Sequence, residues 1–389
     1  MITGKNCIGG QFKSDGSIEF RTINPKENVE NPTVFLEATK DEIATAAELA
    51  WTAFKTFRKI PGKQRADFLN TIADEILALD KELVDMYMLE SGLPEGRAVG
   101  ERGRTVFQLR SFAELVSNDD WRENTFDAAQ PDRKPMPKDD LRKTMIPLGP
   151  VAVFGASNFP LAYSTAGGDT ASALAAGCPV IVKGHPMHAG TNELVASAIV
   201  KAAEKTGMPK GVFSSINGNV QAGVDLVNHP KVKAVGFTGS IGGGRALFDL
   251  AAKRDEPIPV FAEMGSINPV IMTANAISKR GSELAKTYAG SITLGTGQFC
   301  TNPGLLLTVK TDDTEDFIQE LAKETIAIAP QTMFHPNIKK GYQKKGEDVI
   351  SQDGVEAVGE YKGDLEPNDA ASIIASVSGE AFLKNPKMH

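Results

Sequence analysis

One cysteine lies where a nucleophile would be useful. Cys300 sits in the loop 295–304, which contains three glycines, rather than in an apolar strand. This placement favours reactivity over packing, because a reactive thiolate needs access to its substrate. Cys178 begins an apolar strand and is expected to be buried, and Cys7 carries no supporting motif. Cys300 is therefore the candidate nucleophile.

Two polar residues at the ends of expected elements are candidates for further chemistry. Glu263 ends an apolar strand and is closely followed by Gly265. It is either a surface strand end or a general base in a buried cleft. Asn158 lies at the start of an expected helix, where it either caps the helix or donates its amide to an oxyanion.

A glycine-rich turn occupies residues 237–244, after an expected strand and before a helix expected near Arg245. Glycines at such a turn let a helix N-terminus approach a pyrophosphate, whose charge the helix dipole favours. Gly239 and Gly244 are separated by four residues, so the pattern is not the Rossmann G-x-G-x-x-G. A flexible surface loop is the alternative interpretation.

Lys183 and His185 follow another expected strand. The lysine either binds ribose hydroxyls or a phosphate, or is a solvated residue at the strand end. His185 and His188 are three residues apart, and Glu193 is the one carboxylate nearby. Because a zinc site needs a fuller set of ligands, we expect no metal here.

Composition excludes several classes of protein. The 389 residues suggest two or three domains, and 42 basic against 49 acidic residues give a net charge of −7, which argues against nucleic-acid binding. Three cysteines provide no disulfide framework, so we expect a reducing, cytoplasmic location. The longest apolar stretch, Ala171–Val182, is shorter than the roughly 20 residues of a membrane span, and no signal-peptide pattern opens the chain.

The elements expected to position these residues follow an alternating pattern. Strands are expected at 151–154, 179–183, 212–216 and 232–237, and helices at 161–175, 191–206 and 220–228. This alternation predicts a parallel sheet, in which ligands bind at the carboxyl ends of the strands. The polar stretch 117–147 is either an exposed linker or a β-ribbon that meets a partner subunit. A second, less regular α/β region begins near Phe261.

Together these motifs resemble the aldehyde dehydrogenase superfamily over nearly the whole chain. The motifs that carry the resemblance are Ser157–Pro160, Ala175–Lys183, Phe237–Ser240, Glu263–Gly265 and Gly297–Cys300. The resemblance implies a Rossmann-type NAD(P)-binding domain over 1–260, with an oligomerisation ribbon at 120–147. It also implies a catalytic α/β domain over 261–389. Residues 90–110, 184–188 and 263–269 look like the α-ketoglutarate semialdehyde (2,5-dioxopentanoate) dehydrogenases.

The resemblance also implies a mechanism. Cys300 attacks the aldehyde, and the Asn158 amide and the Cys300 N–H meet the oxyanion. Hydride passes to NAD(P), and Glu263 activates water to hydrolyse the thioester. The residues implied in cofactor binding are Phe154, Lys183, His185, Thr238, Gly239, Ser240 and Gly244.

Two positions bear on specificity. Where many NAD-preferring relatives place a glutamate three residues after the lysine, this chain has Pro186. Because that change removes repulsion of a 2′-phosphate, we expect NADP to be accepted at least as well as NAD. Arg104 matches the helix that lines the family's substrate funnel and either binds a distal carboxylate or is solvated. Gln108, one turn on, and Phe159 complete the expected substrate set.

The resemblance leaves alternatives open. Family chains continue beyond the last residues here, and an acidic Phe-Gly-Pro segment is not found, so we expect the C-terminal part of the catalytic domain to be missing and the full-length form to be a homo-oligomer. A catalytically incompetent fragment or binding protein is one alternative, and a long-chain aldehyde dehydrogenase is another. An acylating or phosphorylating enzyme is a third, against which the hydrolytic base Glu263 counts.

Overall fold

The computed structural model describes residues 2–118 and 120–388. Residues 1, 119 and 389, which fall within the expected domains, lie outside this description. The chain divides into two compact units, each described by itself. The first unit comprises Met1–Thr22, Pro32–Tyr87 and Glu95–Met264, and the second comprises Ile23–Asn31, Met88–Pro94 and Gly265–His389. Among the described residues, no helix is long and apolar enough to cross a lipid bilayer.

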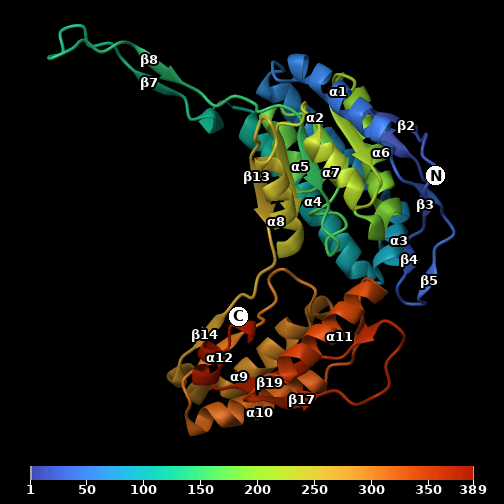
Figure 1. Cartoon of the computed structure of the whole chain (residues 1–389), viewed down its shortest axis with the longest axis vertical. Helices are drawn as coiled ribbons and strands as arrows, with labels where there is room; N and C mark the ends of the chain where they lie inside the picture. The colour runs from blue at the N-terminus through green and yellow to red at the C-terminus, as the bar shows by residue number, and fades with distance from the viewer. Residues whose placement is uncertain (1, 119, 389) are drawn as a thin grey trace. The chain divides into compact units, whose positions relative to one another are not determined.

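A seven-stranded sheet runs through the first unit in the order β13-β12-β9-β10-β11-β1-β2. Its two edge strands, β13 and β2, are labelled in Figure 1. Its strands are β1 (Asn6–Ile8), β2 (Gln11–Lys13), β9 (Val151–Phe154), β10 (Val180–Lys183), β11 (Phe213–Ile216), β12 (Ala234–Thr238) and β13 (Val260–Glu263). The strands from β13 to β11 are parallel, and β1 joins β11 antiparallel. The predicted parallel sheet is confirmed.

Helices cover both faces of this sheet. They are α1 (Lys40–Phe57), α2 (Gly62–Ala78), α4 (Glu95–Val116), α5 (Gly168–Ala176), α6 (Ala189–Lys205), α7 (Val220–Asn228) and α8 (Ile241–Ala252). Apolar residues of α1, α7 and α8 form one core with alternate residues of the strands, including Ala152 and Ile181. Because side chains alternate along a strand, the remaining buried residues, such as Val153 and Val182, face the layer of α5 and α6, on which α2 and α4 pack.

Helix ends follow local chemistry. A capping box starts α1, in which the Thr39 hydroxyl accepts from Glu42 N–H at 3.1 Å and the Glu42 carboxylate accepts from Thr39 N–H at 2.8 Å. α5 ends at Gly177, whose φ of +89° is a conformation that glycine adopts readily. The helix α3 (Asp80–Ser91) lies between α2 and α4 in the chain.

The polar stretch before β9 contains the antiparallel pair β7 (Thr125–Asp127) and β8 (Leu141–Lys143), after the 3₁₀ turn η1 (Asp120–Arg122). All residues of both strands are exposed, including Phe126 and Leu141. Shorter pairs are β3 (Glu19–Phe20) with β6 (Phe35–Leu36) and β4 (Ile23–Asn24) with β5 (Val29–Glu30).

The second unit is built mainly on two long helices. α9 (Ala274–Thr293) and α10 (Asp312–Ile326) share an apolar core with the parallel pair β14 (Val270–Met272) and β15 (Leu306–Thr308). The remaining elements are β16 (Gln331–Thr332), α11 (Pro336–Ile350), β17 (Val355–Glu360), β18 (Asp369–Ala370), β19 (Ile373–Val377), α12 (Gly379–Lys384) and the 3₁₀ turns η3 (Leu294–Gly297) and η4 (Pro386–Met388). A second α/β unit was expected from the sequence, and it is observed.

Two expected helix starts are wrong. The helix expected over 161–175 begins only at Gly168, because residues 160–167 form turns and bends, closed by local bonds such as Gly167 N–H to the Ser164 carbonyl at 2.9 Å. The helix expected near Arg245 begins at Ile241, because the Ser240 hydroxyl caps it by accepting from Gly243 N–H at 3.1 Å.

Candidate functional site

The register of the parallel strands aligns several candidate residues of the first unit. Lys183 pairs with Phe154 across β9 and β10, and Phe154 pairs with Phe237 across β9 and β12. Thr238 pairs with Glu263 across β12 and β13. These residues stand at the carboxyl end of each strand, which is the edge where ligands bind in sheets of this class.

The loop 155–163 follows β9 and carries Asn158. Asn158 lies in a bend well before α5, so the suggested role as a helix cap is wrong. The loop is closed by a hydrogen bond from Ala156 N–H to the Tyr163 carbonyl at 2.8 Å. Ring nitrogen Nε2 of the buried His188 lies 2.9 Å from the Ala156 carbonyl, which fixes the start of the loop. Burial lowers the pKa of His188.

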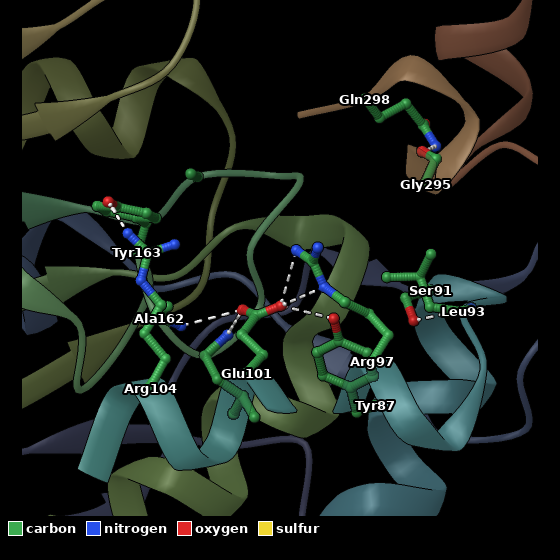
Figure 2. A network of polar contacts seen from close by, with 12 residues as sticks. Tyr87, Ser91, Leu93, Arg97, Glu101, Arg104, Ala162, Tyr163, Gly295 and Gln298 are labelled. Atoms are coloured by element: carbon green, nitrogen blue, oxygen red, sulfur yellow. Dashed lines mark hydrogen bonds and ion pairs between the residues drawn. The ribbon is translucent and has the colours of Figure 1, made fainter. Parts of the chain in front are cut away.

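A buried carboxylate fixes the other end of this loop (Figure 2). Oε1 of Glu101, on α4, accepts hydrogen bonds from Leu161 N–H at 2.8 Å and Ala162 N–H at 3.0 Å. Its Oε2 accepts from the Tyr87 hydroxyl at 2.6 Å and from the Arg97 guanidinium at 3.2 Å. The exposed fraction of the Glu101 side chain is 1%.

Arginines flank the aromatic residues of the same loop. The Arg97 guanidinium lies 4.5 Å from the ring centre of the buried Phe159. Arg104 lies 4.9 Å from the Tyr163 ring centre and donates to its hydroxyl at 2.5 Å (Figure 2). Arg104 is exposed and is nonetheless held by this contact. The Gln108 Oε1 is buried without a hydrogen-bond partner among the described residues.

The candidate cofactor residues on β10 differ in their surroundings. Lys183 is partly buried, its ammonium has no hydrogen bond or ion pair with the described residues, and burial lowers its pKa to about 8. The His185 Nδ1 accepts from Met187 N–H at 3.3 Å, and its ring stacks on that of His188. Lys183 is thus a cation at the end of a strand, and its ammonium can donate hydrogen bonds to a bound anion or hydroxyl group.

The glycine-rich turn has room at its helix start. An alanine Cβ at Gly242 would meet no atom within 4 Å, whereas one at Gly239 would lie 2.6 Å from the Phe237 ring. The Gly239 N–H donates to the Glu263 carbonyl at 3.0 Å, which ties the turn to β13. The helix start, its open space at Gly242 and the Lys183 ammonium, which makes no hydrogen bond with the described residues, fit the phosphates and ribose of a dinucleotide. Gly244 lies within the first turn of α8 and is buried.

Two candidate residues of this edge have surroundings that the sequence did not indicate. Glu263 is exposed in the structure, so the alternative of a base buried in a cleft is not observed. The ring of Phe154 packs in the core, 6.4 Å from the ring centre of Phe237 and against Gly223. Phe154 is therefore a core residue that packs beneath the carboxyl ends of the strands.

Cys300 belongs to the second unit and is exposed on a braced turn. The Asn268 amide donates to the Cys300 carbonyl at 2.7 Å and to the Asn302 carbonyl at 2.8 Å. The Ser266 hydroxyl also donates to the Cys300 carbonyl. The preceding turn is tight, since Thr296 has a φ of +59°. The main chain of the nucleophile candidate is therefore fixed, while its thiol is open to reagents.

The other two thiols are buried. Cys178 lies in the loop just before β10 rather than at the start of the strand; it is buried as expected, and burial raises its pKa. Cys7 lies in β1, and burial raises its pKa to about 12. Both thiols are packed in the interior of the first unit. Because a buried, protonated thiol reacts slowly, neither is a candidate nucleophile.

The carboxylate near the two histidines, Glu193, has a structural role. The described residues contain no group of three or more His, Cys, Asp or Glu that could hold a metal ion. Glu193, the carboxylate near His185 and His188, accepts from Thr3 N–H at 2.6 Å and from Gly4 N–H at 2.8 Å. It therefore anchors the N-terminal segment.

Sequence reasoning missed the residues that brace the candidate groups. Glu101 and Arg97 are four residues apart on α4, and this spacing could have indicated an ion pair but not its contact with a distant loop. No local signal linked Ser266 and Asn268 to Cys300, because these contacts join residues more than thirty positions apart.

The three thiols should differ in reactivity. We expect iodoacetamide to alkylate Cys300 in the native protein and to modify Cys7 and Cys178 at least roughly tenfold more slowly, because both are buried and protonated. Peptide mass spectrometry over time measures this. Cys300→Ser should abolish the fast phase, and equal labelling of Cys178 would contradict the assignment.

Comparisons with known proteins identify the family. The model of the aldehyde dehydrogenase family matches residues 12–360. The chain is 46% identical to alpha-ketoglutaric semialdehyde dehydrogenase 2 of Azospirillum brasilense over 390 residues, which is 99% of this chain and 74% of that protein. It is 44% identical to alpha-ketoglutaric semialdehyde dehydrogenase of Acinetobacter baylyi, over 91% of this chain and 67% of that protein.

Solved structures share the fold. The chain superposes on P. syringae indole-3-acetaldehyde dehydrogenase in complex with NAD+ with a TM-score of 0.84, at 21% identity, covering 100% of this chain and 78% of the other. It superposes on 3,6-anhydro-L-galactose dehydrogenase in complex with NADP with a TM-score of 0.79, at 20% identity, covering 95% and 77%. The sequence resemblance is thus confirmed, and the chain belongs to the aldehyde dehydrogenase family.

Proposed function

We propose that this protein oxidises an aldehyde that bears a distal carboxylate, of the α-ketoglutarate semialdehyde type, to the corresponding acid with NADP or NAD. The observation that carries the proposal is Cys300, an exposed thiol on a turn whose main chain is braced by Ser266 and Asn268. The similarity to two alpha-ketoglutaric semialdehyde dehydrogenases supports the substrate class.

Cys300 is the proposed nucleophile. Its thiolate attacks the aldehyde carbon to give a tetrahedral adduct whose oxygen carries the negative charge. The Asn158 amide and the Cys300 N–H donate hydrogen bonds to that oxyanion. The bracing of the Cys300 carbonyl by the Asn268 amide at 2.7 Å supports a fixed orientation of the Cys300 peptide groups.

Glu263 is the proposed general base. Once hydride has left, its carboxylate removes a proton from the water that attacks the thioester, and the acid and the Cys300 thiol are released. The exposure of Glu263 at the end of β13 supports access to water. When bound, the oxidised nicotinamide supplies the hydride acceptor.

Residues of the parallel sheet edge are proposed to hold the cofactor. Lys183 and His185 would bind the adenosine ribose and its 2′-phosphate, and Thr238 and Ser240, at the glycine turn, would bind the pyrophosphate. The partly buried ammonium of Lys183, which makes no hydrogen bond or ion pair with the described residues, supports this role. Gly242 leaves open space at the helix start, whereas Gly239 and Gly244 make room for the Phe237 ring and the Met264 side chain.

We propose that the two parts of the chain have different functions. Residues 1–260 form the NAD(P)-binding part, and 261–389 form the catalytic part. The exposed antiparallel pair within 120–147, with Phe126 and Leu141 at its surface, supports the proposal that this ribbon contacts partner subunits in a homo-oligomer. The net charge of −7 supports a small-molecule substrate over nucleic acid.

Arg104 is the proposed carboxylate-binding residue, with Gln108 and Phe159 beside it. The Arg104 guanidinium is exposed, and Tyr163 holds it at 2.5 Å. A positioned guanidinium binds a carboxylate through paired, charge-assisted hydrogen bonds. The side-chain NH₂ group of Gln108, one helical turn away, is a donor of the kind that a carboxylate accepts from.

Oxidation of α-ketoglutarate semialdehyde should depend on Cys300 and Glu263. We expect NADPH formation by the chain, a loss of roughly four orders of magnitude in kcat for Cys300→Ala, and a loss of roughly a hundredfold or more for Glu263→Gln. Absorbance at the reduced-nicotinamide band measures all three. Activity retained by Cys300→Ala would overturn the proposal, and so would an inactive wild-type protein that is folded and binds cofactor.

Arg104→Ala should raise KM for the acidic semialdehyde roughly tenfold or more and leave KM for an uncharged aldehyde of similar length nearly unchanged, because only the acidic substrate loses a charge-assisted pair. Arg110→Ala is the matched control, since Arg110 is an exposed arginine of the same helix that pairs with Asp74. An equal rise in KM for both aldehydes refutes a carboxylate role for Arg104.

The affinity for NADP should depend on pH through the charge of the Lys183 ammonium. We expect NADP to bind at least as tightly as NAD, and its dissociation constant to rise above about pH 8, approaching roughly tenfold per pH unit. The sign follows because the ammonium is charged below its lowered pKa and neutral above it. Fluorescence titration between about pH 7 and 9.5 measures this.

Lys183→Gln should bind NADP weakly and without this pH dependence. Lys253→Gln, at the exposed end of α8, serves as control. A pH-independent wild-type affinity, or a hundredfold preference for NAD in kcat/KM, would contradict the assignment.

A further inference from the structure

Glu101 is a buried charge that the proposed chemistry does not use. It lies on α4, and the loop residues that it contacts are 60 and 61 positions further along the chain. With 1% of its side chain exposed, its carboxylate is out of contact with solvent. A buried charge is costly unless it is paired and hydrogen-bonded, so the contacts of this carboxylate need an explanation.

One carboxylate oxygen serves the loop 155–163 alone. Oε1 accepts from two successive main-chain groups, Leu161 N–H at 2.8 Å and Ala162 N–H at 3.0 Å (Figure 2). These residues precede α5 and form turns, so their amides have no helical or strand partner. The carboxylate therefore caps a turn that the local sequence leaves uncapped.

The other oxygen holds the carboxylate in place. Oε2 accepts from the Tyr87 hydroxyl at 2.6 Å and from Arg97 at 3.2 and 3.3 Å. Arg97 also neutralises the charge, and its guanidinium packs over the ring of Phe159 at 4.5 Å. Tyr87 and Arg97 thus hold the Glu101 carboxylate through Oε2, and the carboxylate holds the loop 155–163 through Oε1.

Asn158 lies between two fixed points of this loop. Before it, the Ala156 carbonyl contacts His188 Nε2 at 2.9 Å, and the Ala156 N–H bonds to the Tyr163 carbonyl. After it, the amides of Leu161 and Ala162 bond to Glu101. The conformation of the intervening segment therefore depends on the Glu101 carboxylate.

We propose that Glu101 is the positioning residue for the Asn158 amide, through its hydrogen bonds to Leu161 N–H and Ala162 N–H. This inference rests on the proposed oxyanion role of Asn158. Glu101 does not touch the reacting atoms; it sets the place of the group that does. A displacement of about 1 Å in such a group is enough to cost roughly a hundredfold in rate.

Glu101→Gln tests the inference, because the amide has the same size but turns one acceptor into a donor. Its NH₂ group faces either the two loop amides or the Arg97 guanidinium, and both arrangements set donor against donor, whereas the Tyr87 hydroxyl can also accept. We expect kcat to fall roughly ten- to a hundredfold, with KM for the aldehyde and the dissociation constant of NADP changed less than about threefold.

A double-mutant cycle with Asn158→Ala separates positioning from general damage. We expect Asn158→Ala alone to lower kcat roughly a hundredfold, and Glu101→Gln to lower kcat by less than about threefold in that background. If both single variants lose activity and their effects multiply in full, the positioning role is overturned. If Asn158→Ala keeps full kcat, the proposed oxyanion role fails, and the inference falls with it for that distinct reason.

Hydrogen exchange supplies a readout that does not depend on activity. Peptides spanning 156–165 should exchange faster in Glu101→Gln than in wild type, while peptides of β9 and β10 keep their protection. Tyr87→Phe keeps the carboxylate and removes one donor to Oε2, so it should show a smaller change in the same peptides. Unchanged exchange in 156–165 in both variants would overturn the inference even if Glu101→Gln lost activity.

Discussion

The register of the parallel strands is the constraint on which the first unit depends. Pairing of Lys183 with Phe154, and of Thr238 with Glu263, fixes the height at which each strand ends. A slip of one residue in either pair would turn the end group to the other face of the sheet. The apolar residues of α1, α7 and α8 lock that register, because they pack between alternate residues of the same strands. Ordinary hydrophobic packing thus places the polar groups at one edge.

The loops that leave this edge are held by polar contacts instead. The loop 155–163 has few regular hydrogen bonds of its own, and it is fixed by the Glu101 carboxylate at one end and the His188 ring at the other. In the second unit, Asn268 and Ser266 play the equivalent part for the main chain of Cys300. Such bonds are directional and stronger for charged acceptors, so they fix orientation where apolar contacts would fix only proximity.

The sequence predicted the features that local patterns encode. Runs such as Val180–Lys183 gave the strands, and the family motifs gave the candidate residues and the family itself. It failed where tertiary contacts decide the local structure. Residues from Leu161 have a helical pattern, yet residues 160–167 form turns and bends and the helix begins at Gly168. The Leu161 amide bonds to Glu101, 60 positions away. The exposure of Glu263 was equally beyond a local pattern, since it depends on what packs around the strand end.

The central claim is that Cys300 carries the substrate as a thioester that Glu263 helps to hydrolyse. The most direct measurement is the mass of the Cys300 peptide from Glu263→Gln, quenched shortly after mixing with the semialdehyde and oxidised cofactor. The account predicts an acyl adduct at Cys300, one per chain, that requires the oxidised cofactor and is much shorter-lived in wild type. Reduced cofactor formed in the first turnover without any adduct at Cys300 would contradict it.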